Sequence, residues 1–314
     1  MPLYLGIDTS NYTTSVAVFD SAAGTVIQQK KLLPVASGKL GLKQSDAVFL
    51  HVRQLGTLLE AALGQSAAIA GVAASASPRD EEGSYMPCFL VGLMAAQAVS
   101  ASAKVPLFTF SHQCGHVAAA LYSAGRLELL GSPFLAFHIS GGTTQCLLVE
   151  PDGDRILRVT TIAETLDLNA GQAVDRVGGM LGLEFPAGPR LEELARQSQN
   201  RYRTRPTFKG ADCCLSGLEN LCARRLEEGE APADVARFLM DYLAALMLEM
   251  THRALERHPG LPLVYAGGVM SNGIIRAALE DRYAACFAQP AFSSDNAAGT
   301  AVLCAIKNGG WKPC

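Results

Sequence analysis

The sequence predicts a two-lobed α/β protein in which a strand–turn–strand unit occurs twice. In the first copy, Tyr4–Ser10 is a strand that enters a polar turn, and Thr14–Asp20 returns as the second strand. In the second copy, Phe134–Ile139 enters the turn Ser140–Thr144, and Gln145–Glu150 returns. Both turns end in Thr-Thr, and both return strands are apolar and end in an acidic residue, which indicates an internal duplication. With helices between the copies, we expect two α/β lobes that face a cleft.

The other elements follow from hydrophobic periodicity. Apolar residues at helical spacing predict a helix over Asp46–Leu63, and short apolar runs predict buried strands. We expect further strands at Val26–Leu32, Ala70–Pro78, Pro106–Phe110 and Leu263–Gly268, and helices at Val91–Ala103, from His112 onward, at Asn272–Leu279 and at Ala297–Ile306, with a helical middle region from Gly171 to about Arg257. The expected lobes are residues 1–107 with 293–314, and residues 108–292.

Length and composition indicate a compact protein. The 314 residues suffice for two domains, and the 49% hydrophobic and 18% charged content excludes a disordered chain. No uncharged apolar run reaches the roughly 18 residues of a membrane span. Met1-Pro2 leads directly into the first strand without the pattern of a secretory signal, so we expect a cytoplasmic protein that does not contact a membrane.

Cysteines and net charge are less informative. The nine cysteines form no Cys-x-x-Cys pair, which argues against a cysteine zinc site and favours reduced thiols. The net charge of −3 provides no overall attraction for nucleic acid. Three arginines do alternate with other residues in Asn200–Pro206. This stretch is either a solvated loop or an RNA contact.

Two of the six histidines lie four residues apart in Ser111–His116, at the start of a run that predicts a helix. On a helix this spacing puts the imidazoles of His112 and His116 on one face, close enough to bind one metal ion. Two ordinary surface histidines would give the same pattern. The metal interpretation gains support from the rest of the chain, which supplies glycine turns and a late Asp-Asn pair.

Asp295 is the candidate third ligand. It precedes a helix of small residues, so it either caps that helix or joins His112 and His116 at the metal. Two histidines and one carboxylate leave open positions for substrate and suit iron(II), zinc or manganese. A zinc protease is disfavoured because its helix needs a glutamate base, and Gln113 occupies that position.

Three polar or glycine-rich turns follow predicted strands. Asp8–Thr14 offers an acid and hydroxyls that would hold phosphate or a metal-bound water, or would simply close a hairpin. Ser140–Thr144 and Ala266–Asn272 each contain paired glycines, which let a backbone approach phosphate closely. The Asn272 amide could also read a purine or a ribose. We expect adenine near Gly267 and Gly268, and phosphates near Ser140–Gly142.

These motifs, taken in order, resemble the TsaD family, the catalytic subunits of tRNA threonylcarbamoyladenosine synthesis. The resemblance spans nearly the whole chain. It rests on Leu5–Ser10, Ser111–His116, Ile139–Gly142, Glu164–Asp167 through Asp175, Leu181–Pro189, Leu215–Leu218, Ala266–Asn272 and Asp295–Ala298. It implies the duplicated ribonuclease-H-like fold of the acetate kinase, sugar kinase, Hsp70 and actin superfamily.

The resemblance also implies roles for individual residues. The positions of His112, His116 and Asp295 ligate a divalent metal, Fe²⁺ or Zn²⁺, at the catalytic centre. An adenine nucleotide or threonylcarbamoyl-adenylate is bound by residues that match the family motifs, namely Ser140, Gly141, Gly142, Asp175, Gly188 and Asn272. The strand-end turns add Asp8, Ser10, Ile139, Gly267 and Gly268 to the expected ligand-binding residues.

The implied activity is metal-dependent threonylcarbamoyl transfer from an adenylate to adenine-37 of tRNA. The implied partners are a TsaB-like subunit, a TsaE-like ATPase and tRNA. Two alternatives are a paralogue that transfers a carbamoyl-type group to a different acceptor, and a non-catalytic nucleotide-binding partner of a TsaB-like protein. The retained His112, His116 and Asp295 argue against the second alternative.

Several positions depart from the family pattern. Thr143 replaces a histidine, and Tyr12 and Thr13 stand where the first turn usually carries acids. The usual Glu-Gly-Pro-Gly loop has become residues 76–83, and Glu219 replaces a common lysine. Threonine cannot titrate near neutral pH, and the loss of one acid–base group costs about 100-fold in rate. We therefore expect poor modification of adenine-37, with metal and adenylate binding retained.

Overall fold

The computed structural model describes residues 2–10, 12–34, 42–64 and 68–312. The chain divides into two compact units. The first comprises residues 1–132, 150–159 and 291–314, and the second comprises residues 133–149 and 160–290. The lobe boundaries expected from the sequence stay a prediction. They differ from the division by contacts, in which residues 108–132 belong to the first unit.

The first unit contains a five-stranded mixed sheet in the order β3-β2-β1-β4-β5. Its strands are β1 (Leu3–Asp8), β2 (Thr13–Asp20), β3 (Thr25–Leu32), β4 (Ile69–Ser77) and β5 (Leu107–Ser111). The first three form an antiparallel meander, and β1, β4 and β5 run parallel to one another. Asp8 is therefore the last residue of a central strand, beside the carboxyl end of β4.

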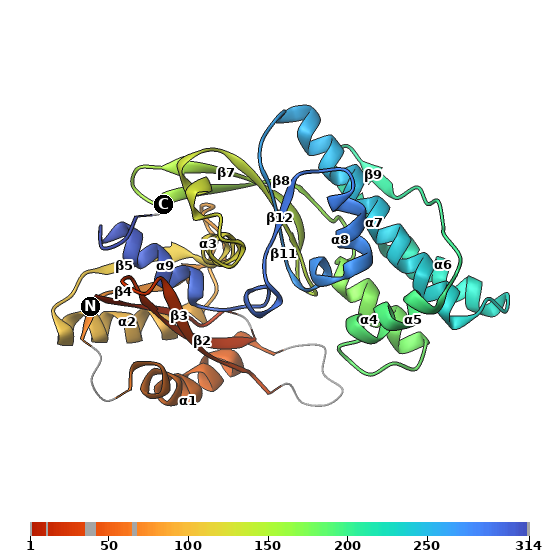
Figure 1. Ribbon diagram of the computed structural model, residues 1–314. Coiled ribbons are helices and arrows are strands. Elements are labelled where there is room, and N and C mark those ends of the chain that lie inside the picture. The colour runs from red at the N-terminus through yellow and green to blue at the C-terminus, as the bar shows by residue number, and fades with distance from the viewer. Residues whose placement is uncertain (1, 11, 35–41, 65–67, 313–314) are drawn as a thin grey trace. The chain divides into compact units, whose positions relative to one another are not determined.

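Helices cover both faces of this sheet (Figure 1). They are α1 (Gln44–Leu63), α2 (Phe89–Ala103), α3 (His112–Ala124) and α9 (Ala298–Lys307), and the 3₁₀ turn Leu127–Gly131 follows α3. Leu5 and Ile7 of β1 pack with Leu55 of α1 and Val91 of α2 in one apolar cluster. The alternate residue Gly6 faces α9, where an added Cβ would lie 2.5 Å from the backbone nitrogen of Ala301. Strand alternation thus places α1 and α2 on one face and α9 on the other.

Glycines let α3 and α9 approach closely. A Cβ on Gly299 would lie 1.9 Å from the carbonyl oxygen of Gly115, and a Cβ on Gly115 would lie 3.0 Å from Thr300 Oγ1. Because contact at these distances is impossible for larger residues, the pair fixes the two helices backbone to backbone. This contact brings the first turn of α3 next to the segment that leads into α9.

The second unit repeats the same sheet order, with β8-β7-β6-β11-β12 matching β3-β2-β1-β4-β5. Its strands are β6 (Phe134–Ile139), β7 (Thr144–Asp152), β8 (Ile156–Glu164), β11 (Leu263–Ala266) and β12 (Ala285–Phe287). The strand β6 pairs antiparallel with β7 and parallel with β11, as β1 does with β2 and β4. The predicted duplication and α/β fold class are confirmed. The end of the β7–β8 hairpin, residues 150–159, clusters with the first unit.

The helices of the second unit surround a large apolar cluster. They are α4 (Ala170–Met180), α5 (Gly188–Gln197), α6 (Ser216–Glu227), α7 (Pro232–Arg257) and α8 (Gly273–Glu280), with 3₁₀ turns at Gly268–Ser271 and Pro290–Phe292. The sequence predicted a helical middle region, but in the structure this region is not entirely helical. A short hairpin of β9 (Thr207–Lys209) and β10 (Asp212–Cys214) interrupts it, because these residues pair with each other through backbone hydrogen bonds.

Two expectations about the whole chain can be checked against the described residues. Within them, no helix is both long and apolar enough to cross a membrane. Every cysteine in this part of the chain is a free thiol, as expected, and most are buried.

Candidate metal centre and nucleotide cavity

The two histidines lie on the first turn of α3. Ser111 begins the helix, because its side-chain oxygen accepts a hydrogen bond from the backbone N–H of Cys114 at 3.2 Å. The rings of His112 and His116 are edge to face, with centroids 4.3 Å apart. Their Nε2 atoms lie 2.9 Å from each other. The prediction that both imidazoles share one face of a helix is confirmed.

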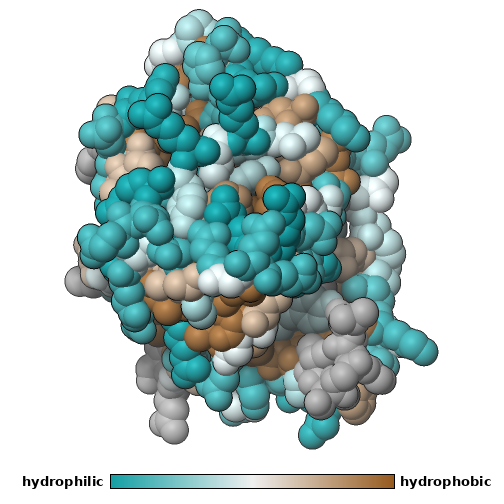
Figure 2. Space-filling view, turned by 90° about the vertical axis from the view of Figure 1, so that its right-hand side faces the viewer, coloured by the Kyte–Doolittle hydropathy of each residue, from teal (hydrophilic) through white to brown (hydrophobic). Residues whose placement is uncertain are grey.

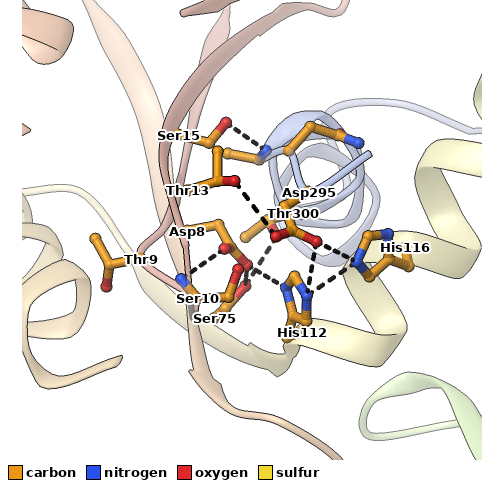
Figure 3. Close-up of polar contacts among 12 residues, drawn as sticks. Asp8, Thr9, Ser10, Thr13, Ser15, Ser75, His112, His116, Asp295 and Thr300 are labelled. Carbon is orange, nitrogen blue, oxygen red and sulfur yellow. Dashed lines mark hydrogen bonds and ion pairs between the residues drawn. The ribbon is translucent and has the colours of Figure 1, made fainter. Parts of the chain in front are cut away.

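Asp295 comes from the segment before α9, and its carboxylate points toward the histidine pair (Figure 3). Its Oδ1 atom lies 3.3 Å from His116 Nε2 and 3.6 Å from His112 Nε2. Asp295 does not cap α9, because Ala297 directly precedes the helix and the N–H of Ala298 donates to Asn296 Oδ1 at 3.0 Å. Asp295 is thus a member of the cluster and not the cap. We call these three residues the His-His-Asp cluster.

The donor atoms of this cluster fit a single divalent ion. Ligand atoms about 2.1 Å from one ion lie about 3.4 Å apart on a tetrahedron and about 3.0 Å apart on an octahedron. The observed separations of 2.9, 3.3 and 3.6 Å span these values. The side chains of His112, His116 and Asp295 are 19%, 9% and 32% exposed, so the centre is accessible to solvent on one side. Three protein ligands with an open side are typical of a catalytic metal site.

A second group of residues orients His112. Its Nδ1 atom lies 2.7 Å from Asp8 Oδ2, and that same carboxylate oxygen accepts a hydrogen bond from Ser75 Oγ at 2.5 Å. The other oxygen of Asp8 accepts the backbone N–H of Ser10 at 2.9 Å. A carboxylate on one ring nitrogen leaves the other nitrogen, Nε2, as the metal ligand and fixes the ring orientation. Sequence reasoning assigned Asp8 to cofactor binding, whereas in the structure it directly contacts His112.

The pKa values of the His-His-Asp cluster depend on burial and on the neighbouring charges. Burial alone would lower the pKa of His112, but the carboxylates of Asp8 and Asp295 outweigh it and raise the pKa to about 10. Burial and the neighbouring charge of His112 lower the pKa of His116, which favours the neutral ring that a metal ligand requires. Although burial would raise the pKa of Asp295, the two imidazoles hold it well below its usual range. One carboxylate and one neutral imidazole are therefore ready to bind a cation.

Two hydroxyl side chains complete the surroundings of the centre. Thr13 Oγ1 donates to Asp295 Oδ2 at 3.3 Å. The Ser10 hydroxyl is buried, and it has no hydrogen-bond partner among the described residues. A buried hydroxyl next to a metal centre is an expected contact for a bound ligand or water. The roles of Ser75 and Thr13 were missed from the sequence. The parallel pairing of β1 with β4 would have indicated Ser75, because adjacent parallel strands end at one edge.

The glycine turns lie in the second unit. The turn between β6 and β7 is closed by a hydrogen bond from the Ser140 N–H to the Thr143 carbonyl at 2.7 Å. It packs against the start of α4, where a Cβ on Gly171 would lie 2.6 Å from the nitrogen of Gly141. This contact places the turn at a helix N-terminus, a position that favours anions.

The turn after β11 depends on Gly267. Its φ is +102°, and an added Cβ would lie 2.1 Å from the carbonyl oxygen of Ile139. Gly268 differs, since a Cβ there would meet no atom within 4 Å. Gly267 therefore holds β11 against β6, while Gly268 faces open space.

That open space is a cavity of about 540 Å³ in the second unit. It is large enough for a nucleotide. Its lining is mostly apolar, with a few acidic and polar side chains: Gly141, Gly171, Val174, Asp175, Phe185, Pro186, Gly188, Pro189, Glu192, Met240, Gly268, Val269, Ser271, Asn272 and Ile275.

Five of the predicted ligand residues line this cavity together. They are Gly141, Asp175, Gly188, Gly268 and Asn272. Ser140, Gly142 and Gly267 belong to the adjoining turns but are not among the lining residues, and Ile139 is fully buried in β6. Asp8 and Ser10 lie in the first unit, with the His-His-Asp cluster.

The polar side chains of the cavity are held by backbone groups. Asp175 Oδ1 accepts the N–H of Ala187 at 3.0 Å, which leaves its second carboxylate oxygen for a ligand. Asn272 begins α8, where its Oδ1 accepts the N–H groups of Ile274 and Ile275. The side-chain oxygen of Asn272 is thus used within the protein, and the amide that was expected to read a purine serves as a helix cap as well.

Solved structures with this architecture cover the whole chain. Component A of (R)-2-hydroxyglutaryl-CoA dehydratase from Acidaminococcus fermentans aligns with a TM-score of 0.57 and 15% identity, over 98% of this chain and all of that one. Full-length HypF in a phosphate- and nucleotide-bound form gives 0.58 and 10% over 98% of this chain and 47% of that one. A glucokinase of the ROK family from Streptomyces griseus, in complex with glucose and AMPPNP, gives 0.53 and 14% over 97% and 99%. These similarities confirm the predicted α/β fold.

The family is established by a sequence match. Residues 37–302 match the model of the family described as TsaD, tRNA N6-adenosine threonylcarbamoyltransferase. The matched range includes both histidines, Asp295 and all the glycine turns of the second unit. The chain therefore belongs to the TsaD family.

Proposed function

We propose that this protein transfers a threonylcarbamoyl group from an adenylate to adenine-37 of tRNA with the help of one divalent metal ion, in the cytoplasm. Family membership supports a transferase of the threonylcarbamoyl type in the broad sense. The observation that carries the metal dependence is the convergence of His112 and His116 from α3 with Asp295 from the segment before α9, with Asp8 behind His112. A chain that served only as a non-catalytic partner would have no use for this arrangement.

In this proposal the His-His-Asp cluster holds the ion, Fe²⁺ or Zn²⁺. The ion would supply a Lewis acid for a carbonyl or phosphate oxygen of the adenylate. Asp8 holds the ring of His112 in one orientation, with Ser75 fixing the carboxylate in turn. The unpartnered Ser10 hydroxyl is positioned to donate a hydrogen bond to a bound ligand. These contacts organise the centre before substrate arrives.

The cavity of the second unit is the proposed site for the adenylate. Adenine would occupy the apolar part near Gly268, and the phosphate would lie near the backbone N–H groups of Ser140–Gly142. HypF, the glucokinase and an activator of 2-hydroxyisocaproyl-CoA dehydratase from Clostridium difficile were each solved with a nucleotide or nucleotide analogue. This fold therefore accommodates nucleotides in those proteins, and the glycine turns here offer the same chemistry.

The direct test is modification of tRNA in vitro. The protein would be combined with a TsaB-like subunit, a TsaE-like ATPase, metal, ATP and the threonylcarbamoyl precursor, next to a known family member. Nucleoside mass spectrometry would then measure modified adenine-37. We expect product that depends on metal and disappears in His116→Ala. Metal-independent product of equal amount would refute the proposed role of the cluster.

A related function with a different acceptor is favoured by one specific contact. Thr13 stands where the family usually carries an acid, and its hydroxyl donates to Asp295. Thr143, on the turn of the second unit, likewise replaces a histidine. The chain therefore lacks two groups able to move protons near neutral pH, one in each unit.

This second candidate predicts that wild-type protein modifies adenine-37 about 100-fold more slowly than the reference family member, while it still binds metal and adenylate. Full activity would show that the substitutions do not matter and that tRNA is the acceptor. If activity is low, Thr13→Glu and Thr143→His should be assayed singly and together. A gain of tRNA modification in these variants would identify the two positions as determinants of the acceptor.

A further inference from the structure

We infer that the second unit binds the phosphate backbone of RNA along one side of α7, through five arginines that have no carboxylate partner among the described residues. They are Arg201, Arg203, Arg205, Arg257 and Arg282, and we call them the arginine face. The identity of the RNA, a tRNA, rests on the proposed function. The location of the contact rests on the structure.

The first observation is the distribution of ion pairs. Of the eighteen arginines in the sequence, twelve have a carboxylate oxygen within 4.0 Å among the residues that the structure describes. Arg53 has no carboxylate partner among the described residues, and its guanidinium lies over the ring of Phe49. The remaining five are those of the arginine face. Apart from Arg53, every described arginine without a carboxylate partner thus lies in this one region of the second unit.

The second observation is the alternation of residues 201–209. The odd-numbered residues from Arg201 to Lys209 are exposed, while the even-numbered residues between them are half-buried. Alternate residues of an extended chain lie about 6–7 Å apart on one side. The positive charges therefore form a row and do not point in all directions.

The inner side of this segment is firmly attached to α7. The guanidinium of Arg225 lies over the ring of Tyr202, 4.9 Å from its centroid. The backbone N–H of Tyr202 donates to the Asp241 carboxylate on α7 at 2.9 Å. Further along, the guanidinium of Arg253 lies 4.4 Å above the ring of Phe208. The arginines used here are already paired with Glu230 and Glu249. The outer row is consequently presented by an ordered backbone, which reduces the entropy lost on binding.

The remaining arginines extend the same side. Arg205 and Arg282 line one hollow with His252 and Glu249, and Arg257 lines the adjoining hollow with the same two residues. The acids in these hollows are already engaged, because Glu249 pairs with Arg253 and Glu256 lies 3.4 Å from His252. Figure 1 shows the segment that leads to β9 running beside α7. From residue 241 to residue 257 this helix extends over about 24 Å.

This surface suits a polyanion better than a protein partner. In Figure 2, which views this side of the molecule, hydrophilic residues cover most of the upper part of the face. Unpaired guanidinium groups in a row match the repeated charges of a nucleic acid backbone, and guanidinium forks bind phosphate in a bidentate manner. The net charge of −3 does not reveal this region, because it sums the positive and negative charges of the whole chain.

The test compares two triple variants of the full-length protein with the same change in charge. The first, R203Q/R205Q/R282Q, removes three charges of the arginine face. The second, R126Q/R158Q/R224Q, removes three exposed arginines that pair with acids. Binding of an unmodified tRNA transcript is measured by filter retention over a range of salt concentrations. Thermal unfolding and ATP binding by calorimetry check that both variants are folded.

Each phosphate contact contributes roughly 0.9 to the slope of log affinity against log salt, or about eightfold in affinity at 0.1 M salt. We expect R203Q/R205Q/R282Q to bind tRNA at least tenfold more weakly and with a slope smaller by about 2–3. The control should resemble wild type. Equal losses in both variants, or none in either, would overturn the inference, and so would wild-type protein that binds no tRNA.

A further arm uses vesicles containing phosphatidylserine. Binding of wild-type protein to vesicles in preference to tRNA, lost in the first variant only, would assign the face to a membrane surface and overturn the RNA assignment. The outcome is distinct from that of the modification assay. Normal tRNA binding through the arginine face without modification would refute the proposed transfer but leave this inference intact.

Discussion

The proposed metal centre of the first unit and the cavity of the second unit are built in different ways from the same duplicated fold. At the end of β1 and the start of α3, side chains create the site, since carboxylates and imidazoles contact one another directly. At the corresponding end of β6, backbone creates it, because glycines let strands and a helix approach closely. The duplication kept the position of a ligand site after the first strand and changed its chemistry.

Substitutions in the two sites should therefore have different effects on binding and on stability. Replacing a side chain in the metal centre removes a ligand and leaves the fold intact. Replacing a glycine near the cavity either breaks the packing or fills the cavity, depending on where its Cβ would point. Metal content, nucleotide affinity and thermal stability can therefore be separated by single substitutions.

The largest effect is expected for His116→Ala. We expect about one divalent ion per chain in wild-type protein and almost none in the variant, because two of three ligands do not retain an ion. Elemental analysis after purification measures this directly. The control is His252→Ala, which removes a surface histidine that also has an i,i+4 partner. Equal metal content in wild type and His116→Ala would show that the ion binds elsewhere.

The two neighbouring glycines of the second unit provide the sharpest contrast. Gly267→Ala places a Cβ 2.1 Å from a backbone oxygen at a φ of +102°, so we expect a loss of about 2–4 kcal/mol in the free energy of unfolding. A Cβ at Gly268 would meet no atom within 4 Å, so we expect Gly268→Val to cost much less stability than Gly267→Ala. The valine side chain would instead occupy the cavity and weaken ATP binding about tenfold or more.

Thermal unfolding and calorimetry, applied to both variants, check this pair of expectations. The comparison requires opposite results for residues that are adjacent in sequence. Unchanged ATP affinity in Gly268→Val would mean that the nucleotide does not bind in this cavity.

A smaller effect is expected for Asp8→Asn, which keeps the shape of the side chain but removes its charge. Asp8 contacts the ring nitrogen of His112 that faces away from the ion, and loss of such a partner weakens metal affinity about 10–100-fold. Competition with a chelator of known affinity measures the change. Asp20→Asn, in an exposed turn at the other end of the hairpin, is the control. Retention of full affinity would show that Asp8 acts directly on substrate instead.

Much of this arrangement could be predicted from the sequence, because it depends on local patterns. Alternation and helical spacing indicated the strands of the duplicated hairpins and most helices. The spacing of His112 and His116 gave the shared helix face. Asp295 was named as the candidate third ligand, but helix capping stayed open as an alternative, since nothing local distinguishes the two roles. In the structure its carboxylate contacts both histidines, and the N–H of Ala298 at the start of α9 donates to Asn296.

The remaining features depend on contacts between distant segments, which local patterns do not encode. The pairing of Asp8 with His112 joins residues 104 positions apart, and the contact of Thr13 with Asp295 joins residues 282 apart. The β9–β10 hairpin was missed because its strands are only three residues long and lie between helices. The unpaired state of the five arginines is equally invisible in the sequence, because it depends on where every acid lies.

The smallest predicted effect concerns the number of protons bound at the proposed metal centre, which should differ between metal-free and metal-loaded protein. Burial would lower the pKa of His112, but Asp8 and Asp295 raise it to about 10, so the metal-free protein carries this proton at pH 7. The pKa of His116 is lowered and that of Asp295 is well below 3.8, so neither adds a proton there. Each ion bound at pH 7–9 should therefore release about one proton, and the apparent affinity should rise about tenfold per pH unit.

Stability should follow the opposite trend in the metal-free protein. A group whose pKa is raised by folding stabilises the native state below its unfolded pKa, here 6.5, and this contribution is lost as the pH rises toward about 10. Metal-free protein should thus unfold at progressively lower temperature above pH 6.5, while metal-loaded protein should not. Calorimetry in buffers of different ionisation enthalpy counts the protons, and thermal scans from pH 6 to pH 10 follow stability. Parallel pH trends in the two forms would show that His112 is not the residue that exchanges its proton for the metal.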